Sequence, residues 1–496
     1  MYSDFYNYKK KHNNKALLLR INALLASLLL TFMSLKFTSY AATDYTAAME
    51  ERKKLEIQSN NTANWPEGPA IGAEAAILLE VNTGTILYAK NIDEELYPAS
   101  TTKILTCLLA AENGDLNDMV TFSYNAVHSV PSDGSNIGID AGESMTLEEC
   151  LYGIMVGSAN ECANAVAEYV SGSIDEFANL MNQRATELGC THTHFVNANG
   201  LFDENHYTSA HDLALIAKAF FSNELLSSIG NTARYHFTAT ATQPDDFYIT
   251  NKHKLINGEI AYDGILGGKT GYTDEARETL VTCAQKNGMK LVCVILKEES
   301  PYQFTDTTTL FDYGFNNFKL TCIADNDSYY IPEDTSFFSS ENDAFGYSGN
   351  VLKWNSDDNI ILPINASIDD CTSEVSYDVS DQIDGTLAIV NYSYNGVSVG
   401  SARILKSTTS SSFSFSSTSL ENAIASNQSI YVNVKLIIII ISSIAGCAII
   451  ILNLSAFIRS LHYAGNDPKE RKRYKRRQKM LKEHKLTYKK SFKKRK

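Results

Sequence analysis

Apolar residues recur with two different spacings along the middle of the chain. The stretch AAILLEVNTGTILYAKN, which starts at residue 75, holds two β-rich runs around the turn Asn82-Thr83-Gly84 and predicts a hairpin. Helical spacing and then further strand-like runs follow, at residues 101–112, 147–156, 162–170, 279–283 and 291–296. Strands at both ends with helices between them predict an α+β or three-layer domain over residues 70–318.

The pattern changes after this region. In residues 319–405 helical spacing stops, and short β runs alternate with turns of Asn, Asp and Ser. The clearest case is GTLAIVNYSYNGVSVGSARIL, in which Asn395-Gly396 suits a type I′ turn between two strands. We therefore expect residues 319–405 to form a small, sandwich-like all-β domain. Residues 406–435, rich in Ser and Thr, are expected to form a linker.

Two long apolar runs lie near the ends of the chain. Residues 1–41 combine a basic start, an apolar stretch and the small-residue site Ser39-Tyr40-Ala41, which indicates a signal peptide that is removed on export. Residues 42–69, polar and charged, are expected to be a tether. The run at 436–457 has 22 residues without a charge, and a membrane span needs about 20. It therefore predicts a transmembrane helix.

Charge is distributed unevenly along the chain, with two basic ends and an acidic middle. The net charge is −14, but residues 1–42 hold six Lys or Arg and one acid, and residues 459–496 hold 17 and three. The part between them holds 20 basic and 53 acidic residues. This excludes a nucleic-acid-binding folded body. By the positive-inside rule, the basic tail at 458–496 stays in the cytoplasm and the body lies outside, although such a tail also suits acidic lipid or nucleic acid.

The amino-acid composition limits which class of protein this chain can be. With 44% hydrophobic and 20% charged residues, the chain is globular rather than disordered or collagen-like. Its nine cysteines show no C-x-x-C pair and no zinc-like spacing with His, and several lie in apolar patterns. We expect them to be mostly unpaired thiols, and we expect no metal site and no cofactor.

The first candidate for chemistry is the S-x-x-K spacing in Pro98-Ala99-Ser100-Thr101-Thr102-Lys103. On a helix, this i, i+3 spacing puts the Lys103 amine beside the Ser100 hydroxyl. A serine hydroxyl is a weak nucleophile that needs an adjacent base. Lysine serves as that base only where burial or nearby positive charge lowers its pKa, and the apolar helix that starts here offers burial. The motif alone is weak, since residues 491–494 in the basic tail match it too.

Two further motifs follow in order. Ser158-Ala159-Asn160 supplies S-x-N at a turn between two apolar helices, where short polar side chains are costly unless they are paired; helix capping is the alternative. Lys269-Thr270-Gly271 supplies K-T-G and occurs once. Lys and Thr on a strand edge suit a substrate carboxylate, and a strand Gly often marks close approach of a ligand or another backbone. An ordinary loop is the alternative.

The order and spacing of the three motifs carry more weight than each motif alone. From Ser100 to Ser158 there are 58 residues, and from there to Lys269 there are 111. This set resembles the serine-type penicillin-recognising enzymes. The stretches SMTLEECLYGIMVGSANECANAVAEYV, FANLMNQRATELGCTHTHFVNANGLFDENHYTSAHDLALIAKAFF and GGKTGYTDEA are similar to D-alanyl-D-alanine carboxypeptidases of the low-molecular-mass penicillin-binding protein type. The resemblance covers residues 70–318 and implies a β-lactamase/transpeptidase-like catalytic domain, an antiparallel sheet with helices.

The resemblance also implies a reaction. Ser100 would be the acylating nucleophile, Lys103 its general base, and Ser158 the relay of a proton to the leaving amine. The enzyme would remove the terminal D-Ala from peptidoglycan pentapeptide stems through an acyl-enzyme that water hydrolyses. β-Lactams would acylate the same serine and stay. The setting would be the bacterial cell membrane, with a single span and the catalytic domain outside.

Substrate binding is implied for Asn160, Lys269, Thr270, Gly271 and Tyr272. Asn160 would bind the substrate amide and help position the general base. Lys269 would orient the relay serine and, with Thr270, receive the terminal carboxylate. The backbone N–H groups of Tyr272 and of the nucleophile would form the oxyanion hole.

The chain departs from the family pattern at three places. Ala159 stands where Gly is usual, Arg277 lies in a segment that commonly reads A-G-Y/F-C/N-L, and Gln303 stands where an Arg often lies. These departures concern carboxylate affinity and turnover rather than the acylating residues. Residues Asn199 and His206, like Asn197, are expected to support loops and caps.

Two other functions remain open from the sequence. A β-lactamase of class A would need a deacylating Glu, usually in an E-x-x-L-N segment between S-x-N and K-T-G, and the sequence has no such segment. The other alternative, from a different class, is a surface protein of the same fold that no longer catalyses and binds the cell wall.

Overall fold

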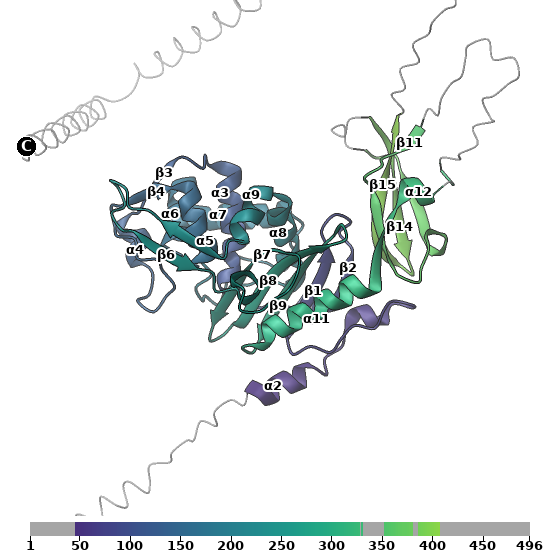
Figure 1. Cartoon of the computed structure of the whole chain (residues 1–496), viewed down its shortest axis with the longest axis horizontal. Helices are drawn as coiled ribbons and strands as arrows, with labels where there is room; N and C mark the ends of the chain where they lie inside the picture. The colour runs from purple at the N-terminus through teal and green to yellow at the C-terminus, as the bar shows by residue number, and fades with distance from the viewer. Residues whose placement is uncertain (1–44, 328, 331–351, 380–384, 407–496) are drawn as a thin grey trace, which may run out of the picture. The chain divides into compact units, whose positions relative to one another are not determined.

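The structure is a computed structural model, and it describes residues 45–327, 329–330, 352–379 and 385–406 (Figure 1). The predicted signal peptide, most of the linker, the membrane helix and the basic tail lie outside the described residues. Within the described ranges, no helix combines the length and the apolar character that a membrane crossing requires.

A five-stranded antiparallel sheet forms the centre of the first region. Its strand order is β2-β1-β9-β8-β7, with the bounds β2 (Ile86–Lys90), β1 (Ala75–Glu80), β9 (Met289–Glu298), β8 (Arg277–Lys286) and β7 (Ile265–Thr273). The hairpin predicted around Asn82-Thr83-Gly84 is confirmed as β1–β2, and the strand-like runs at 279–283 and 291–296 lie in β8 and β9. The α+β class with an antiparallel sheet is therefore confirmed.

Both faces of this sheet are covered. All six residues of β1 are buried, and their side chains alternate between two clusters. Ala75, Ile77 and Leu79 pack with the helical layer, whereas Ala76 and Leu78 pack with α11 (Tyr302–Asn317). The arrangement has three layers: helices, sheet and α11 (Figure 1).

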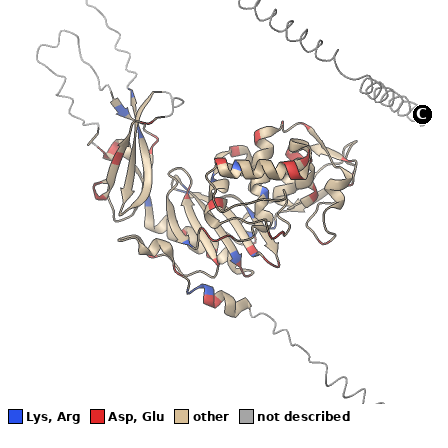
Figure 2. Cartoon of the chain, turned by 180° about the vertical axis from the view of Figure 1, so that it is seen from behind, with Lys and Arg blue, Asp and Glu red and all other residues tan. Residues whose placement is uncertain are grey.

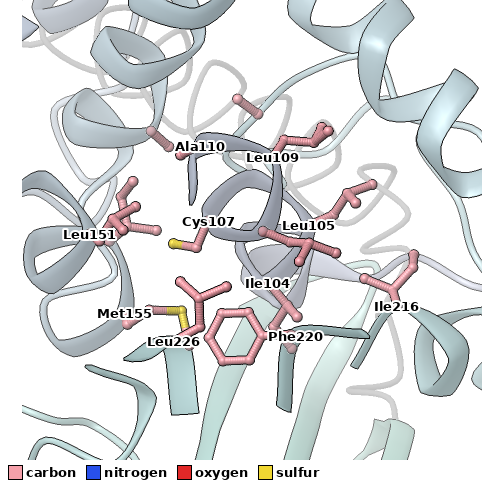
Figure 3. Close-up of a cluster of buried hydrophobic side chains, with 14 of the residues drawn as sticks. Ile104, Leu105, Cys107, Leu109, Ala110, Leu151, Met155, Ile216, Phe220 and Leu226 are labelled. Carbon is pink, nitrogen blue, oxygen red and sulfur yellow. The ribbon is translucent and has the colours of Figure 1, made fainter. Parts of the chain in front are cut away.

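The helical layer is built around α3. Its main members are α3 (Lys103–Asn113), α5 (Leu147–Val156), α6 (Asn160–Ser171), α7 (Ile174–Glu187), α8 (Ala210–Ser222) and α9 (Glu224–Gly230), which confirm the three helices predicted from apolar spacing. Eight consecutive residues of α3, 103–110, are buried. Figure 3 shows Ile104, Leu105 and Cys107 of α3 pointing among side chains of neighbouring helices. A helix that is enclosed on all sides keeps its first residue, Lys103, away from water.

Shorter elements complete this region. They are α2 (Tyr45–Arg52), η1 (Gln58–Asn61), η2 (Ala99–Thr102), β3 (Met119–Thr121), α4 (Tyr124–His128), β4 (Ser144–Thr146), β5 (Arg234–Phe237), β6 (Phe247–Thr250) and α10 (Lys254–Asn257). Acidic and basic residues are interspersed along the helices and strands, as the colouring of Figure 2 shows.

The residues after α11 form mainly β structure. β10 (Phe318–Cys322) pairs with β12 (Asn359–Pro363), and a second sheet has the order β11 (Leu352–Trp354), β15 (Val397–Lys406), β14 (Thr386–Tyr394), β13 (Thr372–Ser376). The short helices α12 (Ile323–Asn326) and η4 (Ile368–Asp370) lie between strands. Asn395 and Gly396 both have positive φ, 48° and 86°, which confirms the type I′ turn predicted between β14 and β15.

The segment at 45–69 is not the polar tether that its composition predicts. Met49 is 2% exposed, and the buried Trp65 donates its Nε1–H to the Leu87 carbonyl at 2.9 Å. Arg52 donates its Nε–H to the Gly72 carbonyl at 2.8 Å. The prediction was wrong because a few apolar and charged side chains, spread among polar ones, make specific long-range contacts that composition does not reveal.

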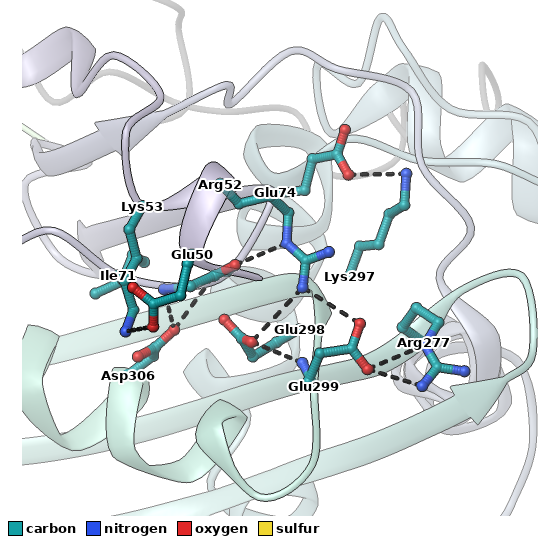
Figure 4. A network of polar contacts seen from close by, with 12 residues as sticks. Glu50, Arg52, Lys53, Ile71, Glu74, Arg277, Lys297, Glu298, Glu299 and Asp306 are labelled. Carbon is teal, nitrogen blue, oxygen red and sulfur yellow. Dashed lines mark hydrogen bonds and ion pairs between the residues drawn. The ribbon is translucent and has the colours of Figure 1, made fainter. Parts of the chain in front are cut away.

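A buried polar network holds this segment to the sheet and to α11 (Figure 4). Asp306 accepts hydrogen bonds from the backbone N–H groups of Gly72 and Ala73, at 2.9 and 3.3 Å. Lys90 donates to three backbone carbonyls, and its burial lowers its pKa to about 8. Burial, together with a hydrogen bond to Asp306, raises the pKa of Glu298. Hydrogen bonds between buried groups therefore join the end of this segment to β2 and to α11.

Candidate active site

The end of η2 and the start of α3 bring Ser100 and Lys103 together. Lys103 Nζ lies 2.9 Å from Ser100 Oγ. The same nitrogen donates to Asn160 Oδ1 at 2.7 Å and to the backbone carbonyl of Asn199. The i, i+3 spacing on a helical turn thus produces the contact that S-x-x-K predicts.

Lys103 is fully buried, and this sets its protonation. Burial, and next the charge of Lys269, lowers the pKa of Lys103 well below its ordinary value. A neutral amine has two N–H bonds and one lone pair. The two carbonyl oxygens can accept both N–H bonds, so that the lone pair is left for the Ser100 hydroxyl. The geometry suits a general base.

A second serine–lysine contact faces the first. Lys269 Nζ donates to Ser158 Oγ at 3.0 Å and to the Thr270 carbonyl at 2.7 Å. Lys269 is buried, and burial, followed by the positive charge of Lys252, lowers its pKa to about 7. Ser158 has a left-handed backbone, φ 59°. This conformation is uncommon for a residue with a side chain and often occurs at functional sites.

Two glycines let other segments approach Ser100 closely. Gly271 lies within β7, so K-T-G is on a strand and not in a loop. A Cβ added there would lie 2.8 Å from the backbone nitrogen of Ser100. Gly200 has φ +82°, and a Cβ on it would lie only 1.9 Å from the Ala99 carbonyl oxygen. Neither position has room for a side chain.

These residues line a cavity of about 790 Å³. Its wall includes most of the predicted site residues, namely Ser100, Ser158, Asn160, Thr270, Gly271 and Tyr272. Lys103 and Lys269 are not part of this wall and lie buried behind it. The cavity therefore presents the hydroxyls of Ser100 and Ser158 to a ligand, while the amines of Lys103 and Lys269 that contact these hydroxyls lie buried behind the wall.

The structure also locates the three departures. Ala159 is buried directly before α6. Gln303 is buried, lines the cavity and donates its Nε2–H to Glu278 Oε2 at 3.0 Å, so a neutral amide stands where the family often has a cation. Arg277 has φ 54° and pairs with Glu299 at 2.7 Å.

The loop residues behave mainly as supports, with one addition. Asn197 Oδ1 accepts the Gly200 N–H at 2.7 Å, and His206 bonds to Thr102 Oγ1 at 2.8 Å. Asn199, however, contributes its backbone carbonyl to the Lys103 amine. Sequence reasoning missed this contact because every residue carries a carbonyl, so no residue type signals it.

The described residues contain no group of three or more His, Cys, Asp or Glu side chains that could hold a metal ion. The eight cysteines in these ranges are free thiols, and those at 107, 150, 162, 283 and 293 are buried. Hydroxyl, amide, amine and carboxylate side chains line the cavity, for example Ser100, Asn160, Lys252 and Asp274.

Comparison with known proteins places this site in a family. The D-alanyl-D-alanine carboxypeptidase profile matches residues 60–300. DacF of Bacillus subtilis, a D-alanyl-D-alanine carboxypeptidase, is 37% identical over 253 residues, which are 50% of this chain and 63% of that protein. DacB2 of Mycobacterium tuberculosis, of the same description, is 31% identical over 266 residues, 52% of this chain and 87% of the relative.

A solved structure supports the fold. Penicillin-binding protein 5 from Haemophilus influenzae superposes with a TM-score of 0.53 at 23% identity, over 68% of this chain and 98% of that one. The resemblance read from the three motifs is confirmed. The matched part of the chain spans 63% of DacF, and the chain belongs to the D-alanyl-D-alanine carboxypeptidase family.

Proposed function

We propose that this chain removes the terminal D-Ala from peptidoglycan pentapeptide stems through an acyl-enzyme on Ser100. One observation carries the proposal above all: the buried amine of Lys103 lies 2.9 Å from Ser100 Oγ, and two carbonyl oxygens accept its N–H bonds. This is the arrangement that a nucleophilic serine needs.

Acylation starts with proton transfer. The Lys103 lone pair takes the proton from Ser100 as Oγ attacks the carbonyl carbon of the penultimate D-Ala. Negative charge then develops on the carbonyl oxygen. We assign its stabilisation to the backbone N–H groups of Ser100 and Tyr272, which belong to segments in close approach at Gly271.

Collapse of this intermediate breaks the peptide bond. The proton held by Lys103 passes through the Ser158 hydroxyl to the amine of the departing D-Ala, while Lys269 orients that hydroxyl. A water molecule, deprotonated by Lys103, then attacks the ester carbonyl and frees Ser100 together with the shortened stem. Atoms balance as one water consumed for each D-Ala released.

Binding of the substrate is assigned to groups around the same cavity. The Asn160 amide binds the peptide backbone, and Thr270 with the charge of Lys269 receives the terminal carboxylate. Since Gln303 is neutral, we expect weaker carboxylate affinity than a cation there would give. A β-lactam would acylate Ser100 in the same way, but its leaving nitrogen stays tethered in the adduct and obstructs the entry of water.

The wider organisation is also proposed, on the sequence pattern. Residues 1–41 would direct export, 436–457 would anchor the chain in a bacterial membrane, and 458–496 would remain in the cytoplasm. The catalytic residues would then face the cell wall. Residues 319–405 would form a small sandwich-like domain, and the strands β10–β15, which dominate its described residues, support this proposal.

The test compares the wild type with Ser100→Ala. The purified full-length chain is incubated with a D-Ala-D-Ala pentapeptide and with fluorescent penicillin. We expect free D-Ala and a stable penicilloyl adduct from the wild type and neither from Ser100→Ala, because the variant has no nucleophile. Rapid penicillin turnover would instead indicate a β-lactamase. A lack of both reactions in the wild type would leave the non-catalytic alternative.

A further inference from the structure

Arg277 holds an unusual backbone conformation beside the cavity. It is the first residue of β8, follows the turn after β7, and has φ 54°. A side chain makes this left-handed region unfavourable, and residues kept there are usually fixed by their surroundings. Arg277 therefore has contacts that offset the strain.

Three groups surround the Arg277 guanidinium. Nη2 pairs with Glu299 Oε2 at 2.7 Å, and Nη1 donates to the hydroxyl of Tyr272 at 3.2 Å. The ring of Tyr45 lies under the guanidinium, 3.9 Å from its central carbon. Tyr272 in turn donates its hydroxyl proton to Asp274 at 2.9 Å. The side chain thus joins the cavity wall to the N-terminal segment.

The other side of Glu299 belongs to the same segment. Arg52 donates to Glu299 Oε1 at 3.3 Å, so the carboxylate of Glu299 lies between two guanidinium groups (Figure 4). These side chains are 9% to 18% exposed, which makes their pairing stronger than that of a surface ion pair. Helix α2 is therefore connected to Arg277, and through it to Tyr272, at both ends. Its first residue, Tyr45, contacts Arg277 directly, and its last residue, Arg52, does so through Glu299.

The position of Tyr272 is critical for the proposed reaction. Tyr272 lines the cavity and directly follows Gly271, whose backbone closely approaches the Ser100 nitrogen. In the β7–β8 ladder, Thr273 is the partner of Arg277 and Tyr272 that of Glu278. A shift of Arg277 would consequently move the backbone N–H of Tyr272.

We propose that Arg277 is a positioning residue that couples the N-terminal segment, through Tyr45 and Glu299, to the oxyanion-binding backbone at Tyr272. The inference rests on the proposed function, because the oxyanion role of Tyr272 belongs to it. The segment at 45–52 then supports the active site from outside the cavity, through the ring of Tyr45 and the guanidinium of Arg52.

The test uses Arg277→Gly, because Gly accepts a left-handed backbone and removes only the side chain. In the full-length chain, purified in detergent, we expect kcat for D-Ala release to fall about tenfold with KM changed less than about twofold, since a transition-state contact is loosened. Tyr45→Ala should lower kcat about threefold. Tyr45→Phe keeps the ring and should match the wild type.

A combined variant and a spectroscopic readout separate positioning from stability. If the two residues act along one route, adding Tyr45→Ala to Arg277→Gly should have no further effect on kcat. With 3-fluorotyrosine at position 272, the fluorine resonance should move in Arg277→Gly and Tyr45→Ala and stay in place in Tyr45→Phe.

Two outcomes would overturn the inference: unchanged kcat in Arg277→Gly, or an unchanged resonance at position 272 in both altered variants. Failure of the proposed function looks different. In that case the wild type releases no D-Ala, and the fluorine resonance still decides whether Tyr45 and Arg277 position Tyr272.

Discussion

Burial shifts the pKa values of two clusters of ionisable side chains in this molecule, and the shifts have opposite directions in the two clusters. Burial lowers the pKa of Lys103 beside Lys269, and burial raises the pKa of Glu298 beside Asp306. For Lys103 and for Glu298 alike, burial favours the neutral form of the side chain, because a low-dielectric interior penalises charge. Only the lysine pair stands behind a cavity wall that contains hydroxyl groups. A perturbed pKa therefore indicates a functional site only when the group also contacts reactive side chains that line a cavity.

Replacing Lys103, whose amine lies 2.9 Å from Ser100 Oγ, should separate the two clusters most clearly. We expect Lys103→Met to lower the rate of penicillin acylation about 10³-fold, because the Ser100 hydroxyl loses its proton acceptor. The rate of adduct formation with fluorescent penicillin measures this effect. Glu298→Gln is the matched control from the other cluster, and it should acylate within about twofold of the wild type. Wild-type acylation by Lys103→Met would remove Lys103 from the mechanism.

The carboxyl cluster should instead affect stability. Asp306→Ala leaves the buried N–H groups of Gly72 and Ala73 without their acceptor, which should lower the free energy of unfolding by about 2–3 kcal/mol. Guanidinium unfolding of the chain measures the change. Thr305→Ala, at the exposed neighbouring position of α11, should change it by less than about 0.5 kcal/mol. Equal effects of the two substitutions would contradict a structural role for Asp306.

The smallest expected effect concerns pH. Lys269 needs its proton to bind a carboxylate, and its pKa is lowered to about 7, so D-Ala release should decline as the pH rises through that value. The nearby charge of Lys252 contributes to this lowering. Lys252→Met should raise the pKa of Lys269 and move the alkaline limb of kcat/KM upward by up to about one pH unit. Lys252→Arg and Glu298→Gln should leave the limb unmoved; a shift in either would show that it reports another group.

The sequence predicted the parts of this molecule that depend on local spacing. Ser100 and Lys103 meet because they are one helical turn apart, and the strands of the sheet follow from runs of apolar residues. The segment at 45–69 escaped prediction because its contacts are remote: Arg52 and Glu299 are 247 positions apart. Arg277 was noticed as a departure from the family pattern, but its contact with Tyr45 joins two segments that no local pattern relates.

The two glycines beside Ser100 also limit which substitutions this protein can accept. Positions 200 and 271 leave no space for even a methyl group, since a Cβ at either position would meet the backbone between Pro98 and the Ser100 nitrogen. Under selection by an inhibitor, we expect accepted substitutions to gather at exposed positions of the wall, for example at Phe202, which lines the cavity and is 44% exposed. Steric contacts prevent substitution of the two glycines next to Ser100, so resistance to an inhibitor should arise from exposed residues of the cavity wall.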